Sequence, residues 1–280
     1  MKKHRGAKIT VIISFILIIC GSLLLGAGVV QGGSLRYLSV NSNTVSWWPF
    51  GFGNIGVGFF DEAFDDDFMD SSNSGTSEKQ LGDVKSFSID ADVADIEIHR
   101  GTTNKIRYRV RSNQNISIDE NSGNVSVALK HKRGINHNNG SIYVELKDEI
   151  YDKIKVDCAV GEISINGTKT KELIVKADLG NIELEDIYSE ETKVDEKCGE
   201  INIDGVLLGR SEISNKLGST DVNIKGNPSE YRYEVKNSLG STQIMDSDHD
   251  GKADVAGGNS SAKNFISIKN SLGDIELEFN

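Results

Sequence analysis

One acidic segment carries residue types whose spacing could bind a metal ion. It reads D-S-D-H-D-G-K-A-D, with Gly251 directly after the third aspartate. Oxygen ligands at alternate positions, a glycine for the sharp turn and a backbone carbonyl at the seventh position are typical of calcium loops. The candidate ligands are Asp246, Asp248, Asp250, Lys252 and Asp254.

This segment departs from a complete calcium loop at its far end. The twelfth position, which normally supplies a bidentate glutamate, is Gly257. A site without that ligand belongs to the weak class typical of extracellular modules. The spacing therefore predicts a weak, structural Ca²⁺ site, and the alternative is a solvated acidic turn with an Asp-Gly bend.

No other segment carries a recognisable catalytic pattern. There is no G-x-S-x-G sequence, no phosphate-binding loop and no dinucleotide-binding glycine pattern. Carboxylates that we expect to point outward from strands are usually only solvated; they are Glu162, Glu200, Asp221 and Asp274. We expect no enzymatic activity, and a polysaccharide-acting β-helical enzyme is the alternative that these carboxylates leave open.

A sequence repeat indicates the secondary-structure elements that would position any such site. Gly161, Gly180, Gly199 and Gly218 follow one another at intervals of 19 residues. A β-branched residue stands five positions before each of them, and alternating apolar residues follow the first three. A fixed period of this length indicates stacked copies of one unit, and the alternation indicates strands with one buried face. The sequence predicts an all-β, single-stack β-solenoid with about 19 residues per rung.

The repeat becomes less regular toward the C-terminus. Gly240 and Gly273 are separated by 33 residues, and this longer interval contains the acidic segment. Asn215, Asn237 and Asn270 share one position of the repeat, so their amides are predicted to stack in a hydrogen-bonded ladder. The strand 275–279 is predicted to close the stack, with its charges protecting the last edge.

The cysteines do not form a disulfide framework. Cys158 and Cys198 lie two rungs apart, which is too far for a disulfide at about 4.8 Å per rung. Cys198 takes the place of a valine or leucine beside the repeat glycine. We therefore expect both thiols to be free and Cys198 to pack as a small core residue.

The N-terminal part of the chain has a different character. Residues 9–30 carry no charge and are long enough to cross a bilayer as a helix, and Lys2, Lys3, Arg5 and Lys8 precede them. The positive-inside rule then predicts a cytoplasmic tail over 1–8, a transmembrane helix over 9–30, an aromatic and acidic tether over 31–80 and an extracellular solenoid domain over 81–280. A cleaved signal peptide is the competing interpretation.

The overall charge limits the possible partners. The chain has a formal net charge of −11. An acidic surface repels nucleic acid, so no nucleic-acid partner is expected, whereas cations or basic peptides suit it.

Several segments together resemble a known family. Residues 87–109, the run I-Y-V-E-L at 142–146, the run D-K-I-K-V at 152–156 and the repeated G-x-I-x-I units are similar to the bacterial putative-adhesin family. This is a domain of unknown function, often carried on a single N-terminal membrane helix and encoded near cell-envelope-stress genes. The resemblance covers roughly residues 85–280. It implies a fold and a place in the cell envelope, and it transfers no catalytic motif.

Two functions follow from these observations. The first is a membrane-anchored, non-catalytic binding or sensing module whose acidic face contacts an envelope polymer, a cationic peptide or a partner membrane protein. The second is a structural or regulatory subunit of an envelope-stress membrane complex, in which the anchor and the tether make the specific contacts.

Overall fold

The computed structural model describes residues 76–111, 114–131 and 140–280. Within these residues the chain is almost entirely β-structure, with one short 3-10 turn at Pro228–Glu230. No helix among them is long and apolar enough to cross a membrane. The predicted transmembrane helix over 9–30, the tail before it and most of the tether lie outside the described residues.

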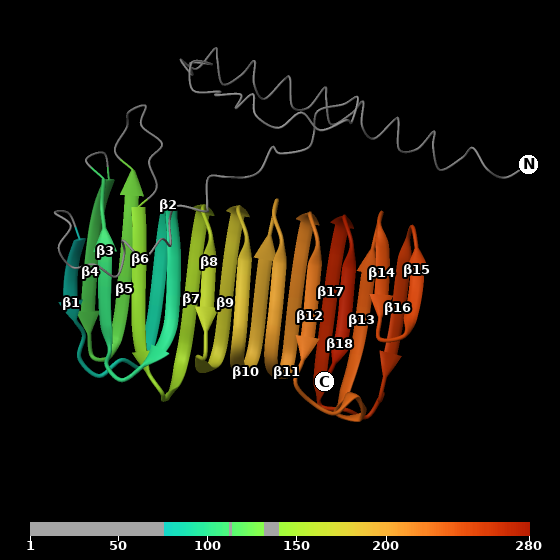
Figure 1. The fold of residues 1–280 in the computed structure, drawn as a ribbon. Coiled ribbons are helices and arrows are strands. Elements are labelled where there is room, and N and C mark those ends of the chain that lie inside the picture. Colours follow the sequence, from blue (N-terminus) through green and yellow to red (C-terminus); the bar gives the residue numbers. More distant parts are fainter. Residues whose placement is uncertain (1–75, 112–113, 132–139) are drawn as a thin grey trace, which may run out of the picture. The chain divides into compact units, whose positions relative to one another are not determined.

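The 18 strands belong to one hydrogen-bonded sheet (Figure 1). Their bounds are β1 Thr76–Gln80, β2 Ser86–Gly101, β3 Lys105–Arg109, β4 Gln114–Asn121, β5 Asn124–His131, β6 Gly140–Lys147, β7 Ile150–Val160, β8 Ile163–Asn166, β9 Lys169–Leu179, β10 Ile182–Glu196, β11 Ile201–Leu217, β12 Thr220–Ile224, β13 Tyr231–Asn237, β14 Ser241–Ile244, β15 Ser247–Asp250, β16 Ala253–Gly258, β17 Asn264–Leu272 and β18 Ile275–Phe279.

Each rung of the solenoid contributes one strand segment to each of two walls. We call wall A the stack of β7, β9, the second half of β10, the second half of β11, β17 and β13. Wall B is the stack of β8, the first half of β10, the first half of β11, β12, β18 and β14. Neighbouring strands within each wall are parallel and in register, which confirms the predicted solenoid of stacked units.

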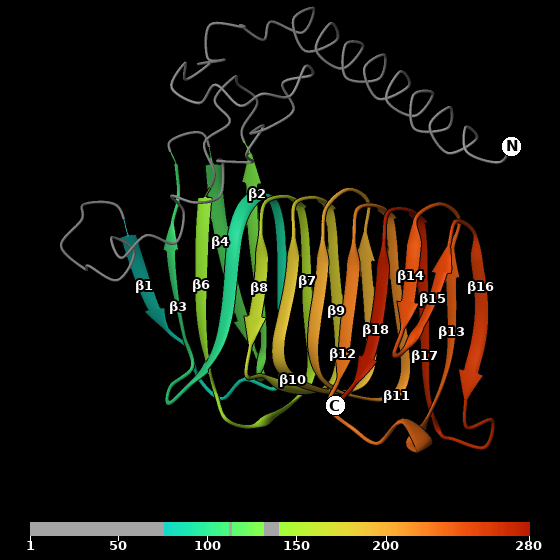
Figure 2. The same cartoon turned by 45° about the vertical axis from the view of Figure 1, so that its right-hand side comes forward.

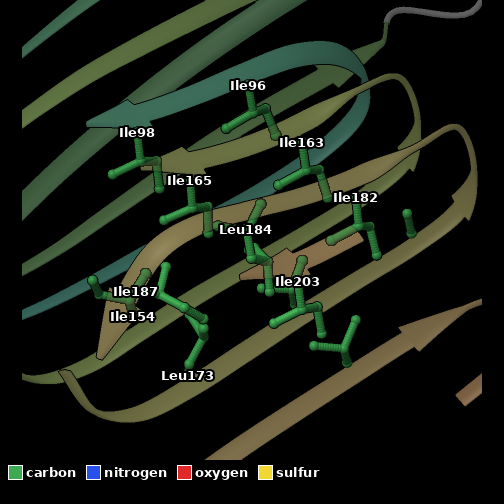
Figure 3. Packing of buried hydrophobic residues seen from close by; sticks show 14 of the residues in the cluster. Ile96, Ile98, Ile154, Ile163, Ile165, Leu173, Ile182, Leu184, Ile187 and Ile203 are labelled. Atoms are coloured by element: carbon green, nitrogen blue, oxygen red, sulfur yellow. The ribbon is translucent and has the colours of Figure 1, made fainter. Parts of the chain in front are cut away.

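The core lies between the two walls and is built from columns of aliphatic side chains. In wall A, Val156, Val175 and Val194 are register partners on successive rungs, and all three are fully buried. In wall B, Ile163 and Ile182 form the equivalent column (Figure 3). The alternation read from the sequence thus places the aliphatic side chains of successive rungs in one continuous core.

The turn glycines join wall A to wall B at one edge of the stack. Gly180 and Gly218 have positive φ values of 148° and 131°, and each donates its backbone N–H to a carbonyl of a neighbouring rung at 3.1 Å and 2.9 Å. A Cβ added to Gly218 would lie 1.8 Å from the carbonyl oxygen of Gly199. Both the backbone conformation and the available space therefore require glycine here.

The residue before each turn glycine differs from the expectation. Leu179 is 49% exposed, and Cys198 is only half-buried. The prediction that Cys198 packs in the core is therefore wrong. Its position lies on the turn, where the backbone directs the side chain along the edge of the stack. Both described cysteines are free, as predicted.

The order of the rungs at the C-terminal end also differs from the expectation. The strand pair β17–β18 lies between β11–β12 on one side and β13–β14 on the other (Figure 1). The prediction that 275–279 forms the last edge is therefore wrong. After β12 the chain skips one rung position and forms β13 and β14. It then reverses through β15 and β16, and β17 and β18 occupy the skipped position.

Both ends of the parallel stack are closed by antiparallel strands (Figure 2). At the C-terminal end, β16 pairs with β13 and β15 pairs with β14. At the other end, β4 pairs with β5 and β3 pairs with β6, while β2 lies one rung further in. The reversed strands end the parallel repeat at both ends of the stack. At the N-terminal end, β1 pairs antiparallel with β3 and covers the outer edge of that strand.

The close contact above Gly218 leads to a test. We expect Gly218→Ala to lower the free energy of unfolding by about 3 kcal/mol or more, because the methyl group meets the Gly199 carbonyl and the positive φ is strained. Gly251→Ala is the control: its φ is +85°, but nothing lies within 4 Å of the added Cβ, so it should lose only about 1–2 kcal/mol. Urea denaturation of both variants measures the difference. Equal losses would show that the rung-to-rung contact is unimportant.

Candidate functional site: the acidic face

The outward side of wall B carries a concentration of carboxylates. We define the acidic face as the outward side chains of β10, β11, β12 and β18 on this wall. They are Glu183, Glu185, Asn202, Asp204, Asp221, Asn223, Glu276 and Glu278. Six of the eight are acidic, and none is basic. Together with the edges of three core residues they line an open groove of about 260 Å³.

The register of the strands brings these side chains into rows across the rungs. Asn202 is the partner of both Glu183 and Asp221, and Asp221 is in turn the partner of Glu276. Neighbouring strands are about 4.8 Å apart, so Asp221 and Glu276 are close enough to repel each other.

The electrostatics of the face reflect this crowding. Partial burial raises the pKa of Glu183, and the neighbouring Glu185 raises it further. Burial, then Glu200 and Asp274, raise the pKa of Asp221. Burial, followed by Asp221 and Glu278, raises the pKa of Glu276. These carboxylates are destabilised when ionised, so a nearby positive charge would be favourable.

Asparagine amides provide part of the compensation within the face. Asn223 Nδ2 donates to Asp204 Oδ2 at 2.8 Å, and Asn166 Nδ2 on β8 donates to Glu185 Oε2 at 2.9 Å. At the border of the face, the ammonium group of Lys225 pairs with Asp204 and lies 3.4 Å from Asp186 Oδ1. No such cation pairs with Glu183, Asp221 or Glu276 within the described part of the chain.

Wall A has the opposite character on its outward side. There, basic and acidic side chains alternate and pair. Lys153 Nζ lies 3.0 Å from Glu172 Oε2, Arg210 Nη2 lies 2.6 Å from Glu212 Oε1, and a third pair joins Lys236 to Glu234 at 2.7 Å. These carboxylates on wall A thus have cationic partners, whereas Glu183, Asp221 and Glu276 on wall B have none among the described residues.

The sequence-predicted calcium segment folds as a hairpin. Asp246 lies in the two-residue turn after β14, and β15 runs antiparallel to β14 with Asp248 opposite Gln243 and Asp250 opposite Ser241. Gly251 has a φ of +85°, as a sharp turn requires. Asp248 and Asp250 are exposed on an extended strand, and this conformation does not wrap them around a cation.

The remaining two candidate ligands lie beyond that turn. Lys252 is exposed, and Asp254 belongs to β16, which pairs with β13 in wall A, whereas β15 pairs with β14 in wall B. Asp254 Oδ1 lies 3.8 Å from Lys236 Nζ. Among the described residues, no group of three or more His, Cys, Asp or Glu side chains is arranged to hold a metal ion. The residues do not fit a calcium site in this conformation, and binding a cation would require the hairpin to rearrange.

The four carboxylates expected to point outward have different roles. Asp221 belongs to the acidic face, while Glu162 and Glu200 lie near it. Burial and Asp95 raise the pKa of Glu162. Asp274 instead accepts hydrogen bonds from the N–H and the hydroxyl of Ser241, at 2.8 Å and 2.7 Å, and these bonds lower its pKa. Asp274 therefore holds a turn together.

Comparison with known protein families identifies the family of this domain. The family model described as Toastrack DUF4097 matches residues 84–227, just over half of the 280-residue chain. The chain belongs to the Toastrack DUF4097 family. The resemblance to the putative-adhesin family is thereby confirmed. Among curated proteins, none matches this Toastrack chain.

Several solved structures are similar to the Toastrack domain at low sequence identity. A "putative cell adhesion protein" from Clostridium sporogenes is 13% identical, with a TM-score of 0.45 over 73% of this chain and 99% of its own. A "putative adhesin" from Bacteroides fragilis is 12% identical, with a TM-score of 0.32 over 73% and 96%. A "putative lipid binding protein" from Parabacteroides distasonis is 13% identical, with a TM-score of 0.30 over 75% and 98%.

The hairpin around Asp248 leads to a second test. We expect millimolar calcium to leave the melting temperature of the Toastrack chain unchanged, because wrapping a cation would break the pairing of β14 with β15. Calcium and magnesium titrations followed by thermal unfolding measure this, with Asp248→Asn as the matched variant. A calcium-specific rise in melting temperature that Asp248→Asn abolishes would show that the hairpin rearranges into a binding loop.

Proposed function

We propose that this Toastrack chain is a non-catalytic binding module of the cell envelope that holds a basic partner against its acidic face. The partner class is a cationic peptide or a lysine- and arginine-rich segment of another protein. The observation that carries the proposal is the row of Glu183, Asp221 and Glu276, whose charges have no basic counterpart within the described part of the chain.

The arrangement of the carboxylates favours binding over catalysis. Burial and neighbouring acids raise the pKa values of all three in the same direction. An acid–base pair needs two carboxyl groups whose environments push their pKa values apart. A regular row across successive rungs instead offers repeated contacts to an extended partner.

The same electrostatics give the binding a distinctive dependence on conditions. A lysine or arginine placed between these carboxylates would relieve their repulsion and lower their raised pKa values. Binding should therefore release protons, weaken as the pH falls toward the range where the carboxylates are protonated, and weaken with added salt.

The proposed location rests on the N-terminal sequence. In this proposal residues 9–30 cross the membrane, the tail 1–8 is cytoplasmic and the solenoid domain is extracellular. The hypothesis of an envelope-stress complex that binds partners through 1–80 concerns residues that lie almost entirely outside the described part of the structure, and it stays a prediction.

Binding of a defined basic probe tests the proposal. The full-length protein is titrated against a fluorescent lysine-rich peptide, and anisotropy gives the dissociation constant. We expect the triple variant Glu183→Gln, Asp221→Asn, Glu276→Gln to bind about three-fold to a hundred-fold more weakly, because each of the three charge contacts contributes about 0.2–1 kcal/mol.

The matched control removes three carboxylates from the outward side of wall A: Glu172→Gln, Glu191→Gln, Glu212→Gln. It has the same net charge as the first variant and leaves the acidic face intact. If both variants lose the same affinity, the overall charge determines binding and the acidic face is not the site. If neither loses affinity, the partner binds through another part of the chain.

A further inference from the structure

One column of inward positions changes character along the solenoid. It stands three residues before each turn glycine, or before Ala94 in the first rung, and its members are register partners on successive rungs. From the N-terminal side the column contains Ala91, Cys158, Ala177, Glu196, Asn215, Asn270 and Asn237. Glu196 is the only acidic residue in the column, and it is 2% exposed.

The asparagines show what the polar half of this column does. Asn215 Nδ2 donates to the carbonyl of Gly199 at 3.0 Å, and Asn270 Nδ2 donates to the carbonyl of Gly218 at 2.7 Å. Asn237 donates to Gly273 in the same way at 2.9 Å. The amides do not bond to one another, so the predicted amide ladder is wrong. Each amide instead holds the turn carbonyl of the adjacent rung.

Glu196 places a carboxyl oxygen where the other rungs place an amide nitrogen. A Cβ on Gly218 would lie 3.4 Å from Asn215 Nδ2, and a Cβ on Gly273 would lie 3.2 Å from Asn270 Nδ2. The corresponding atom on Gly199 would lie 3.3 Å from Glu196 Oε1 and 1.4 Å from the Gly180 carbonyl oxygen. A carboxyl group thus stands beside this turn where the other rungs have an amide group.

The hydrogen bonds of Glu196 are incomplete in the ionised form. Oε1 accepts the backbone N–H of Cys198 at 3.1 Å, as Asn215 Oδ1 accepts that of Leu217 at 3.2 Å, which leaves Oε2 in the role of the amide nitrogen. Oε2 is buried and has no hydrogen-bond partner among the described residues. A buried, half-satisfied carboxylate beside carbonyl oxygens is costly, whereas a protonated carboxyl can donate to one of them.

The charged groups around Glu196 do not neutralise it. On β9, Asp178 lies close enough to disfavour the ionised form, and its own partner is Lys197. Lys176, Asp195 and Lys216, from β9, the same strand and β11, line the open groove outside the column. Burial first, and Asp178 in addition, raise the pKa of Glu196 to about 7, although the N–H groups of Cys198 and Lys197 oppose the shift. Cys198 faces the same carboxyl, and burial raises the pKa of its thiol.

We propose that Glu196 is a proton-dependent latch: its protonated carboxyl donates to a turn carbonyl of the neighbouring rung, as the asparagine amides do, and its ionisation loosens that turn. By the repeat, the equivalent acceptors are the carbonyls of Gly180 and Glu200. Three rungs thus close with a permanent amide donor, and the adjacent rung closes with a donor that depends on pH.

The direction of the pH dependence follows from the raised pKa. The folded protein binds the Glu196 proton more tightly than the unfolded chain, whose pKa is near 4.5. The contribution to stability is therefore fully present below about pH 4.5 and is lost as the pH rises through about 7. The turn should be firm in an acidic medium and loose in an alkaline one.

Glu196→Gln tests the latch because it keeps the shape of the protonated carboxyl and supplies a permanent donor. We expect it to raise the melting temperature at pH 8 by about 5 °C or more and to change it by no more than about 1 °C at pH 4.5. Glu191→Gln, an exposed change on the same strand, is the control and should follow the wild-type pH profile. A Glu196→Gln profile parallel to the wild type would overturn the proposal.

A second measurement avoids any variant that fails to fold. The wild-type chain is labelled with ¹³C at glutamate carboxyls and titrated by NMR between pH 4 and 9. We expect one carboxyl, assigned to Glu196, to titrate near pH 7, together with faster amide exchange at Cys198 and Gly199 above that pH. A Glu196 carboxyl that titrates near 4.5 would overturn the proposal.

Discussion

The space above each turn glycine is the constraint on which the solenoid depends. A Cβ on Gly180, Gly199 or Gly218 would lie 1.9, 1.4 or 1.8 Å from the carbonyl oxygen of the preceding turn glycine. Successive turns can approach this closely only when every one lacks a side chain, and that approach keeps the strands of both walls in register. The aliphatic columns, the edge of exposed leucines and the rows of outward charges all follow from this alignment.

The sequence was sufficient to predict the repeated middle rungs and insufficient to predict how the two ends of the stack are built. Gly161 to Gly218 recur at a fixed interval with alternating neighbours, so the middle rungs could be predicted directly. At the C-terminal end, N-S-L-G occurs at both 237–240 and 270–273. Identical local sequences present identical inward faces, so nothing local indicates which one pairs with the strand that ends at Leu217. In the structure, β15 and β16 cover the outer edges of β14 and β13, and β17 and β18 occupy the inner rung.

The candidate sites were only partly predictable, because each depends on strand pairings that the local sequence does not reveal. Asp221 could be listed as an outward carboxylate, but its repulsion with Glu276 depends on a strand pairing that skips 50 residues of chain. The acidic run at 246–254 matches a calcium loop in spacing alone, and spacing does not distinguish a wrapped loop from a hairpin. The pairing of Thr242 with His249 makes this segment a hairpin and not a wrapped loop. No role was predicted for Glu196, although it stands three residues before Gly199 just as Asn215 stands three residues before Gly218.

The placement of β17 and β18 inside the stack has a consequence for how the chain is made. β17 and β18 follow β13 and β14 in the chain, so a ribosome delivers them later, yet they lie between two pairs of strands that emerged earlier. The solenoid therefore cannot grow rung by rung in the order of synthesis. Before β17 and β18 are made, β11 and β13 both lack the strand that pairs with them in the folded domain. The rungs on either side of β17 and β18 can therefore take their final register only after these two strands have been synthesised.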